Sequence, residues 1–292
     1  MNIAILSRDA NIYSTHRLIQ EGRQRGHNIF IIDHTQCNIV IENNRPKIYF
    51  QDLKIKNIDA VIPRIGANVT EIGASVIQHF ESMGIFTTLS STSLINSRNK
   101  IKSLQILSKE NISIPNTCYI NKLTHTSVIE KTLGKPPWII KIPEGTQGIG
   151  VILSESVSSA ESTIEALTKL NSKVIVQEFI KESKATDIRV FIVNGKILGA
   201  MKRSASKGFR SNLHRGAIGE PVELTPKEQR LALEAVKILG LNIAGVDLLQ
   251  SNKGPLIMEV NSSPGLEGIE QYSSINIAKE IILAAENLFK TK

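Results

Sequence analysis

The stretch LIMEVNSSPG, residues 256–265, carries Glu259 and Asn261 at the end of an apolar run and then enters a Ser-Ser-Pro-Gly turn. Side chains two positions apart share one face of a strand. An earlier apolar run, IAGVDLLQ (243–250), is joined to it by an Asn-Lys-Gly segment, which predicts a β-hairpin. If those three residues form the loop, Asp247 lies opposite Glu259. Two carboxylates and an amide on one face suit Mg²⁺ or Mn²⁺, and a solvent-facing strand with ordinary surface acids is the alternative.

A second hairpin precedes this one. DIRVFIV (187–193) and KILGAMKR (196–203) flank an Asn-Gly pair, which is typical of a type I′ turn. Asp187 and Arg189 share one strand face, and Arg203 ends the partner strand, so the two arginines can approach each other. Two cations at that place would suit a phosphoryl group in transfer. Salt bridges among neighbouring side chains are the alternative.

A glycine-rich loop, EGTQGIG (144–150), lies between two predicted strands. Gly145 and Gly148 would let backbone N–H groups close over a phosphate. The loop lacks the Gly-Lys-Ser/Thr ending of a P-loop and leads into a strand, so taken alone it favours a hairpin turn over a nucleotide site. Lys141 lies inside the preceding apolar strand WIIKIP and must reach the strand's edge or pair with an anion, for which a phosphate is the natural candidate.

The segment FRSNLHRGA (209–217) is basic and has almost no apolar content. Arg210, Asn212, His214 and Arg215 favour an anion-binding loop, and an exposed basic loop is the alternative. We expect His214 to hydrogen-bond within the loop rather than act as a catalytic base.

The first third of the chain alternates short apolar strands with helical stretches, which predicts a parallel sheet covered by helices. The pattern predicts strands at residues 2–6, 28–33 and 59–64, and helices at residues 13–26 and 67–84. Arg64 ends the third strand, where ligands of open α/β sheets bind, so it is a candidate for gripping a carboxylate.

The rest of the chain predicts two further lobes in a mixed α/β protein with α+β character. A helix at 97–112 precedes strands at 137–143, 150–155 and 173–180, a helix at 158–169, the two hairpins, a helix at 226–240 and a terminal helix to about residue 289. We expect an N-terminal α/β domain at 1–95, a central lobe at 96–180 and a C-terminal lobe with the metal site at 181–292.

Composition limits the function classes. The chain has 292 residues, 41% of them hydrophobic, and no apolar run approaches the roughly 18 residues that span a bilayer. Its N-terminus is too soon charged for a secretory signal, so we expect a cytoplasmic protein with no membrane partner. The two cysteines match no zinc or redox spacing. A net charge of +8 favours anionic partners, but with 4% aromatic residues we expect no direct binding of nucleic acid.

The order of these features along the chain resembles the ATP-grasp superfamily of carboxylate–amine ligases, with Lys100 on a helix and VQEF ending in Glu178 and Phe179 as further members of the series. IAILSRD, DAVIPRIG, EGTQGIGV, FRSNLHRG, GVDLL and MEVNSSPGLEGIE together resemble the RimK-type glutamate ligases, which add glutamate to the C-terminus of a small-subunit ribosomal protein. The resemblance covers the whole chain. One departure is the Gly-Phe pair between Lys207 and Arg210, where the family carries an acidic residue, which puts the substrate contacts of that loop in doubt.

The resemblance implies an ATP-grasp fold after an N-terminal α/β domain, and it implies roles for individual residues. The implied ATP contacts are Lys100 and Lys141 on the phosphates, Gly145 and Gly148 over them, Glu178 and Phe179 at the adenine, Asp187 on the ribose side, and Arg210, Ser211 and Asn212. The implied metal ligands are Asp247, Glu259 and Asn261, holding two Mg²⁺ or Mn²⁺ ions. Arg189 and Arg203 would be catalytic, and Arg64, His214 and Arg215 would contact substrate.

The expected partners are ATP, L-glutamate and the C-terminal tail of a small-subunit ribosomal protein, and the resemblance suggests a homotetramer. One alternative is a ligase that polymerises free glutamate or modifies a small molecule. A non-enzymatic alternative is a ribosome- or RNA-binding module that retains a nucleotide fold.

Overall fold

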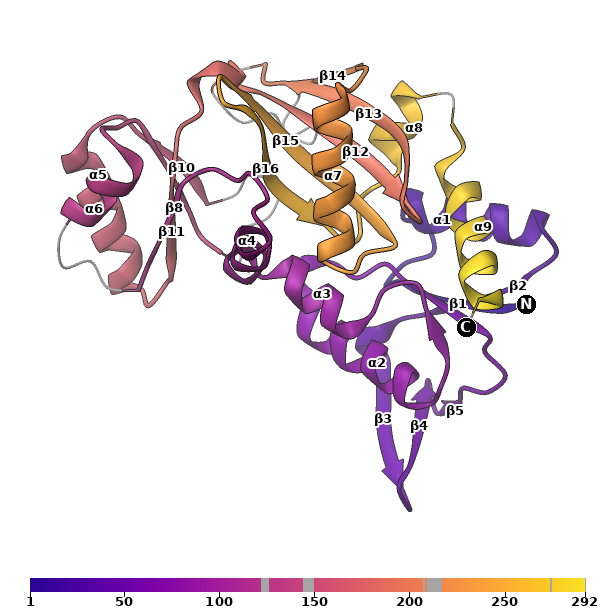
Figure 1. Ribbon diagram of the computed structural model, residues 1–292. Coiled ribbons are helices and arrows are strands. Elements are labelled where there is room, and N and C mark those ends of the chain that lie inside the picture. Colours follow the sequence, from indigo (N-terminus) through magenta and orange to yellow (C-terminus); the bar gives the residue numbers. More distant parts are fainter. Residues whose placement is uncertain (122–125, 144–149, 207, 209–216, 274, 292) are drawn as a thin grey trace.

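The computed structural model has three regions built around β-sheets (Figure 1). It describes residues 1–121, 126–143, 150–206, 208, 217–273 and 275–291. Within these residues no helix is long and apolar enough to cross a membrane.

The N-terminal sheet is parallel, with the strand order β2–β1–β6–β7. Its strands are β1 (Asn2–Leu6), β2 (Asn28–Ile32), β6 (Ala60–Pro63) and β7 (Phe86–Thr87). The first three agree with the predicted strands to within one residue. A parallel sheet needs cover on both faces, and here helix α2 (Thr70–Ser82) packs on the face that carries Ala4 and Leu6.

The other face of this sheet, which carries Ile3 and Ile5, is covered by α1 (Tyr13–Gln24) and by the last helix of the chain, α9 (Ile277–Lys290). Figure 1 shows α9, in yellow, lying beside α1, in indigo. The hydrophobic core of the first domain therefore includes residues from both ends of the sequence.

A small antiparallel sheet projects from the N-terminal domain beside α2 (Figure 1) and was not predicted. It consists of β3 (Cys37–Glu42), β4 (Arg45–Phe50) and β5 (Leu53–Lys54). Ile48 is buried in the core beneath it, and the ring of His79 on α2 lies 3.1 Å from the backbone oxygen of Lys47.

The single helix predicted at residues 97–112 is wrong, because the chain forms α3 (Ser91–Arg98) and α4 (Lys100–Lys109) with a break at Asn99. The backbone of Asn99 is extended (φ −79°, ψ 103°), and its side chain caps α4 by accepting a hydrogen bond from the N–H of Lys102. Asn99, the capping residue, is thus the one non-helical position between Arg98 and Lys100.

The central sheet is antiparallel, with the order β10–β9–β11–β8. Its strands are β8 (Thr117–Ile120), β9 (Trp138–Lys141), β10 (Val151–Ser154) and β11 (Val174–Glu178), and its helices are α5 (Ser127–Leu133) and α6 (Val157–Lys169). Strand β8 and helix α5 were not predicted. Trp138 and Ile164 belong to a hydrophobic cluster of this lobe's own.

The C-terminal sheet is also antiparallel, with the order β14–β13–β12–β15–β16. Its elements are β12 (Thr186–Val193), β13 (Lys196–Ser204), β14 (Ile218–Pro221), α7 (Pro226–Ile238), β15 (Ile243–Ser251), β16 (Gly254–Asn261) and α8 (Glu267–Tyr272). Asn194 and Gly195 have φ values of 47° and 71°, which agrees with the predicted type I′ turn between β12 and β13.

Asp247 on β15 lies opposite Glu259 on β16, as predicted, but the predicted three-residue loop is wrong. Ser251 pairs with Gly254, so the turn itself contains two residues. Leu248 pairs with Ile257 and Asp247 pairs with Glu259, so Met258 is an extra residue that forms a bulge in β16. This bulge restores the predicted pairing of Asp247 with Glu259.

Candidate active site

A cleft of about 1070 Å³ lies where the central sheet, the C-terminal sheet and the N-terminal domain meet. The central lobe contributes Lys141 on β9, the C-terminal lobe contributes Asp247 and Glu259, and the N-terminal domain contributes Arg64. Residues from each predicted region therefore face one space, as a site for two or three substrates requires.

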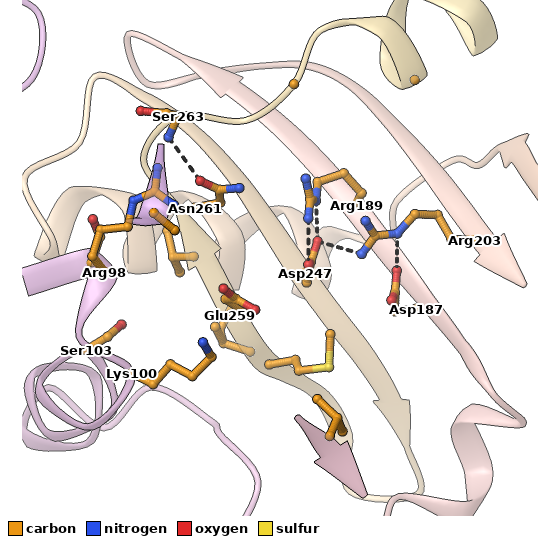
Figure 2. Close-up of a pocket in the computed structure, with 18 of the residues that line it drawn as sticks. Arg98, Lys100, Ser103, Asp187, Arg189, Arg203, Asp247, Glu259, Asn261 and Ser263 are labelled. Carbon is orange, nitrogen blue, oxygen red and sulfur yellow. Dashed lines mark hydrogen bonds and ion pairs between the residues drawn. The ribbon is translucent and has the colours of Figure 1, made fainter. Parts of the chain in front are cut away.

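The three predicted metal ligands lie on two adjacent strands of the C-terminal sheet and line this cleft. Asp247 is 4% exposed, whereas Glu259 is exposed to the cleft. Asn261 follows on the same face of β16, and its Oδ1 accepts a hydrogen bond of 3.0 Å from the N–H of Ser263. Figure 2 shows Glu259 between the Asp247 carboxylate and the side chain of Lys100.

Asp247 is held by both predicted catalytic arginines (Figure 2). Arg189 donates to it through Nε and through Nη2, the latter at 2.7 Å from Oδ2. Nη2 of Arg203 lies 3.0 Å from Oδ1, as an ion pair, while Nε of Arg203 donates to Asp187 at 2.6 Å. The two arginines do come together, and the salt bridges named as the alternative to a phosphoryl site are present.

These contacts set the protonation of the buried carboxylate. Burial opposes the ionisation of Asp247, but Arg189 and Arg203 outweigh it and hold its pKa below the ordinary value. Burial also opposes the charge on Arg203, and Asp247 and Asp187 outweigh that effect, so the pKa of Arg203 is raised. Asp247 is therefore anionic throughout the physiological pH range, which a metal ligand must be.

The oxygen atoms at this place fit a divalent cation. A carboxylate offers about four lone-pair positions, and Arg189 donates two hydrogen bonds to Asp247, so this carboxylate keeps lone pairs for a further ligand. Asn261 Oδ1 keeps a second lone pair beside its bond from Ser263. In the described residues no three His, Cys, Asp or Glu side chains converge, so an ion here would rely on two carboxylates, an amide and ligand oxygens, which is the usual environment of Mg²⁺.

Two lysines, which the resemblance assigned to the ATP phosphates, face these carboxylates from the opposite wall. Lys100, at the start of α4, donates from Nζ to the carbonyl of Pro143 at 2.9 Å. Lys141 lines the cleft from the end of β9. Its pKa is lowered to about 8, chiefly by burial and also by Lys100, while Glu259 and Asp247 act in the opposite direction. Cations and carboxylates thus face one another across a space where a polyphosphate would fit.

Phe179 lines the same cleft as the apolar side chains of Ile139, Ile175 and Met258, and such side chains suit a purine ring. The carboxylate of Glu178 also lines the cleft and accepts a hydrogen bond of 2.8 Å from the backbone N–H of Asn116, so it holds the entry to β8. Seven predicted site residues lie outside the described residues: Gly145, Gly148, Arg210, Ser211, Asn212, His214 and Arg215.

Arg64 reaches across the domain boundary, where its Nη2 donates to the carbonyl of Pro264 at 2.5 Å. Burial and, to a smaller extent, the neighbouring Arg98 together lower its pKa to about 10. Arg98 was not predicted. Its Nη2 donates to the carbonyl of Ile65 at 2.6 Å, and its Nε is buried without a hydrogen-bond partner among the described residues.

Burial also lowers the pKa of Arg98, which Glu259 counteracts. Arg64 and Arg98 thus form a cationic pair beside the predicted metal ligands. In sequence Arg98 stands two positions before Lys100. Recognising Asn99 as a helix cap would have predicted a break there, with Arg98 and Lys100 on either side of it and both directed to the site.

The fold has structural relatives of known class. It matches a D-alanine–D-alanine ligase from Bacillus anthracis (TM-score 0.72, 21% identity, 100% of this chain and 99% of that one) and a RimK domain ATP-grasp protein from Sphaerobacter thermophilus (TM-score 0.75, 18% identity, 98% and 99%). It also matches the ATP-grasp ligase PsnB in complex with a precursor variant, Mg and ADP (TM-score 0.76, 17% identity, 100% and 99%). The fold is ATP-grasp, and the protein is an ATP-grasp ligase, an enzyme that forms carbon–nitrogen bonds at the expense of ATP.

Sequence comparison identifies the branch of this class. The RimK PreATP-grasp domain matches residues 1–94 and the RimK-like ATP-grasp domain matches residues 97–285, so the chain belongs to the RimK family. A relative in Marinobacter nauticus, named probable alpha-L-glutamate ligase, is 47% identical over 99% of this chain and 97% of its own. A relative of the same name in Vibrio cholerae is 48% identical over 97% and 94%.

Proposed function

We propose that this chain ligates L-glutamate to a carboxylate acceptor with ATP as the energy source. The observation that carries the proposal is the oxygen set of Asp247, Glu259 and Asn261 facing Lys100 and Lys141 across one cleft. Relatives named probable alpha-L-glutamate ligase over nearly the full chain support glutamate as the amine substrate.

The reaction needs two displacements. A carboxylate is a poor electrophile, so an oxygen of the acceptor carboxylate attacks the γ-phosphorus of ATP, ADP leaves, and an acyl phosphate forms. The amino nitrogen of glutamate then attacks the acyl carbon, the C–O bond to phosphate breaks, and the amine loses a proton. The products are an amide, ADP and phosphate. A cleft closed to water protects the acyl phosphate from hydrolysis.

The chain's own residues have distinct roles in this proposal. Lys100 and Lys141 hold the phosphates and offset their charge, and Phe179 contacts the adenine, while Glu178 holds the adjoining hinge and Asp187 approaches the ribose. Asp247, Glu259 and Asn261 would hold two Mg²⁺ or Mn²⁺ ions, which would neutralise charge on the terminal phosphates. The presence of Mg with ADP in the related fold of PsnB supports Mg²⁺.

Arg189 and Arg203 stabilise negative charge on the phosphoryl group in transfer, which is the proposed catalytic contribution. Since both already bind Asp247, they also position that carboxylate for the metal. Arg64, with His214 and Arg215 of the basic loop, is the proposed contact for substrate carboxylates.

For the acceptor we propose the C-terminal tail of a small-subunit ribosomal protein. The net charge of +8 favours the approach of acidic substrates. Free glutamate and small-molecule carboxylates are the competing acceptors. The RNA-binding module is disfavoured, because binding RNA does not require acids and lysines that face one another in a cleft. We also propose a homotetramer in the cytoplasm, which native mass spectrometry and cell fractionation would test.

The test combines the purified protein with ATP, Mg²⁺ and each amino acid in turn, with and without the ribosomal protein. Phosphate release and the intact mass of the acceptor are measured. Masses that increase in glutamate steps are the expected result. Glutamate-dependent turnover without a mass change would move the acceptor to free glutamate or a small molecule. Salt-sensitive RNA binding without turnover under any condition would contradict the ligase assignment.

The matched variants are Glu259→Gln, in the cleft, and Glu234→Gln, on the exposed face of α7. Loss of turnover in the first alone would tie the activity to this cleft. Equal activity in both would exclude Glu259 from the reaction.

A further inference from the structure

A second hollow of about 1030 Å³ runs along α2 and α3 and opens into the same site. It shares Arg98, Lys100, Glu259 and Asn261 with the main cleft. The lysine and the predicted metal ligands therefore stand where two separate passages meet. A substrate in the groove between α2 and α3 can reach the reaction centre while the main cleft is filled.

The outer wall of this groove, which we call the α2–α3 groove, is mostly uncharged. Its side chains include Ser75 and Gln78 on α2 and Ser91 and Thr92 on α3. Ile72 and Ile95 also line it, and they are 36% and 42% exposed. Among the described residues of this outer wall Glu71 carries the only charge. Hydroxyl and amide groups beside exposed apolar side chains suit the main chain and side chains of an extended peptide.

The inner end of the groove is cationic. Arg98 lies at the junction of groove and cleft, with its Nε buried and without a hydrogen-bond partner in the described part of the chain. Arg64 lies close enough for the charge of Arg98 to lower its pKa, in addition to the larger effect of burial. Two guanidinium groups at this short range repel each other, so together they attract an anion. A chain with a terminal carboxylate matches this arrangement, because its neutral body meets the outer wall and its charged end meets Arg98.

We propose that the α2–α3 groove binds the last residues of an extended polypeptide acceptor and delivers its terminal carboxylate to Arg98, next to Lys100 and Glu259. This inference rests on the proposed ligase function and narrows it, because a free amino acid would not need the outer groove. The nucleotide occupies the main cleft, and the acceptor chain leaves the site between α2 and α3.

The test uses two serines of α2 that differ in position relative to the groove. Ser75 lines it, whereas Ser82 lies outside it; both are exposed, and each hydroxyl donates to the backbone carbonyl four residues earlier. Ser75→Trp obstructs the groove, and Ser82→Trp adds the same side chain elsewhere. Thr92→Trp, on the facing helix α3, obstructs the groove from its other wall.

The probe is a fluorescein-labelled octapeptide that ends in glutamate, titrated by anisotropy in the presence of ADP and Mg²⁺. The KM values for the unlabelled octapeptide and for ATP are measured in parallel. We expect Ser75→Trp and Thr92→Trp to weaken octapeptide binding, and to raise its KM, by about tenfold or more, with an unchanged KM for ATP. Ser82→Trp should match the wild type.

The outcomes separate this inference from the proposed function. Wild-type binding of the octapeptide without ATP-dependent amide formation would contradict the ligase function and leave the groove assignment intact. The groove assignment is wrong if the wild type ligates the octapeptide and both groove variants keep the wild-type affinity and KM for it. Failure of the wild type to bind the octapeptide, while it extends free glutamate, would overturn it as well.

Discussion

Arg189 binds Asp247 with two N–H groups, and Asp247 in turn lies opposite Glu259 in the neighbouring strand. The two acids on this strand pair therefore differ in freedom: Asp247 is braced by arginines, while Glu259 is exposed to the cleft. A metal ion would therefore bind one carboxylate that is fixed and one that can adjust to the position of the ion.

This difference predicts that Glu259 governs metal affinity. Glu259→Gln keeps the shape of the side chain but loses the charge, so the Mg²⁺ concentration for half-maximal turnover should rise by about tenfold or more. The measurement is an Mg²⁺ titration after removal of metal with EDTA. Glu234→Gln on α7 is the control, and an identical titration curve for the two variants would contradict the metal assignment.

The Arg189–Asp247 pair predicts an effect on stability. Arg189→Met leaves a buried carboxylate with Arg203 as its remaining partner, so the free energy of unfolding should fall by up to about 3 kcal/mol. Arg189→Met combined with Asp247→Leu should regain much of that loss, because no buried charge then stays uncompensated. Urea unfolding of both proteins checks this, and a double variant less stable than the single one would contradict it.

The lowered pKa of Lys141 predicts proton uptake when nucleotide binds. In the empty cleft the amine loses its proton above its pKa of about 8, whereas nearby phosphates favour the charged form and raise that pKa. Between these two values, binding of ADP with Mg²⁺ should draw up to one proton from the buffer. Titration calorimetry at pH 8.5 in buffers with different ionisation enthalpies measures this number.

The control for that experiment is Lys141→Arg, which keeps a cation that stays protonated in this pH range. It should bind nucleotide without the additional proton. The same uptake in both proteins would assign the proton to another group.

The helix break at Asn99 predicts a small but specific loss of stability. Asn99→Ala removes the side-chain cap of α4 and should cost about 1 kcal/mol of unfolding free energy, whereas Asn99→Ser, which can also cap, should cost less. Because Arg98 and Lys100 flank the break, the alanine variant should also raise the KM for ATP. Denaturant unfolding and steady-state kinetics test both effects, and equal stability of the two variants would exclude the capping role.

Much of the metal patch was predictable because strand period and hairpin pairing are local rules. The predicted pairing of Asp247 with Glu259 was nevertheless correct only because two errors cancelled. The predicted loop was one residue too long, and the bulge at Met258, which sequence does not reveal, shifted the register back by one.

Other parts depended on information that is not local. Strand β3 (CNIVIE) carries three consecutive apolar residues instead of a clean alternation, β4 opens with Arg-Pro-Lys, and β5 has only two residues, so their sheet was missed. The helical pattern across Asn99 hid a break that capping stabilises, and with it Arg98. The apolar face of α9 indicated a helix, but amphipathicity does not specify which sheet the helix will cover.

The position of α9 has a consequence for biosynthesis. Ile3 and Ile5 are synthesised roughly 270 residues before the helix that, beside α1, buries them. The hydrophobic core of the first domain is therefore incomplete until α9 has been synthesised. A nascent chain that lacks α9 should bind chaperones through that sheet face, and release from them should follow the synthesis of α9.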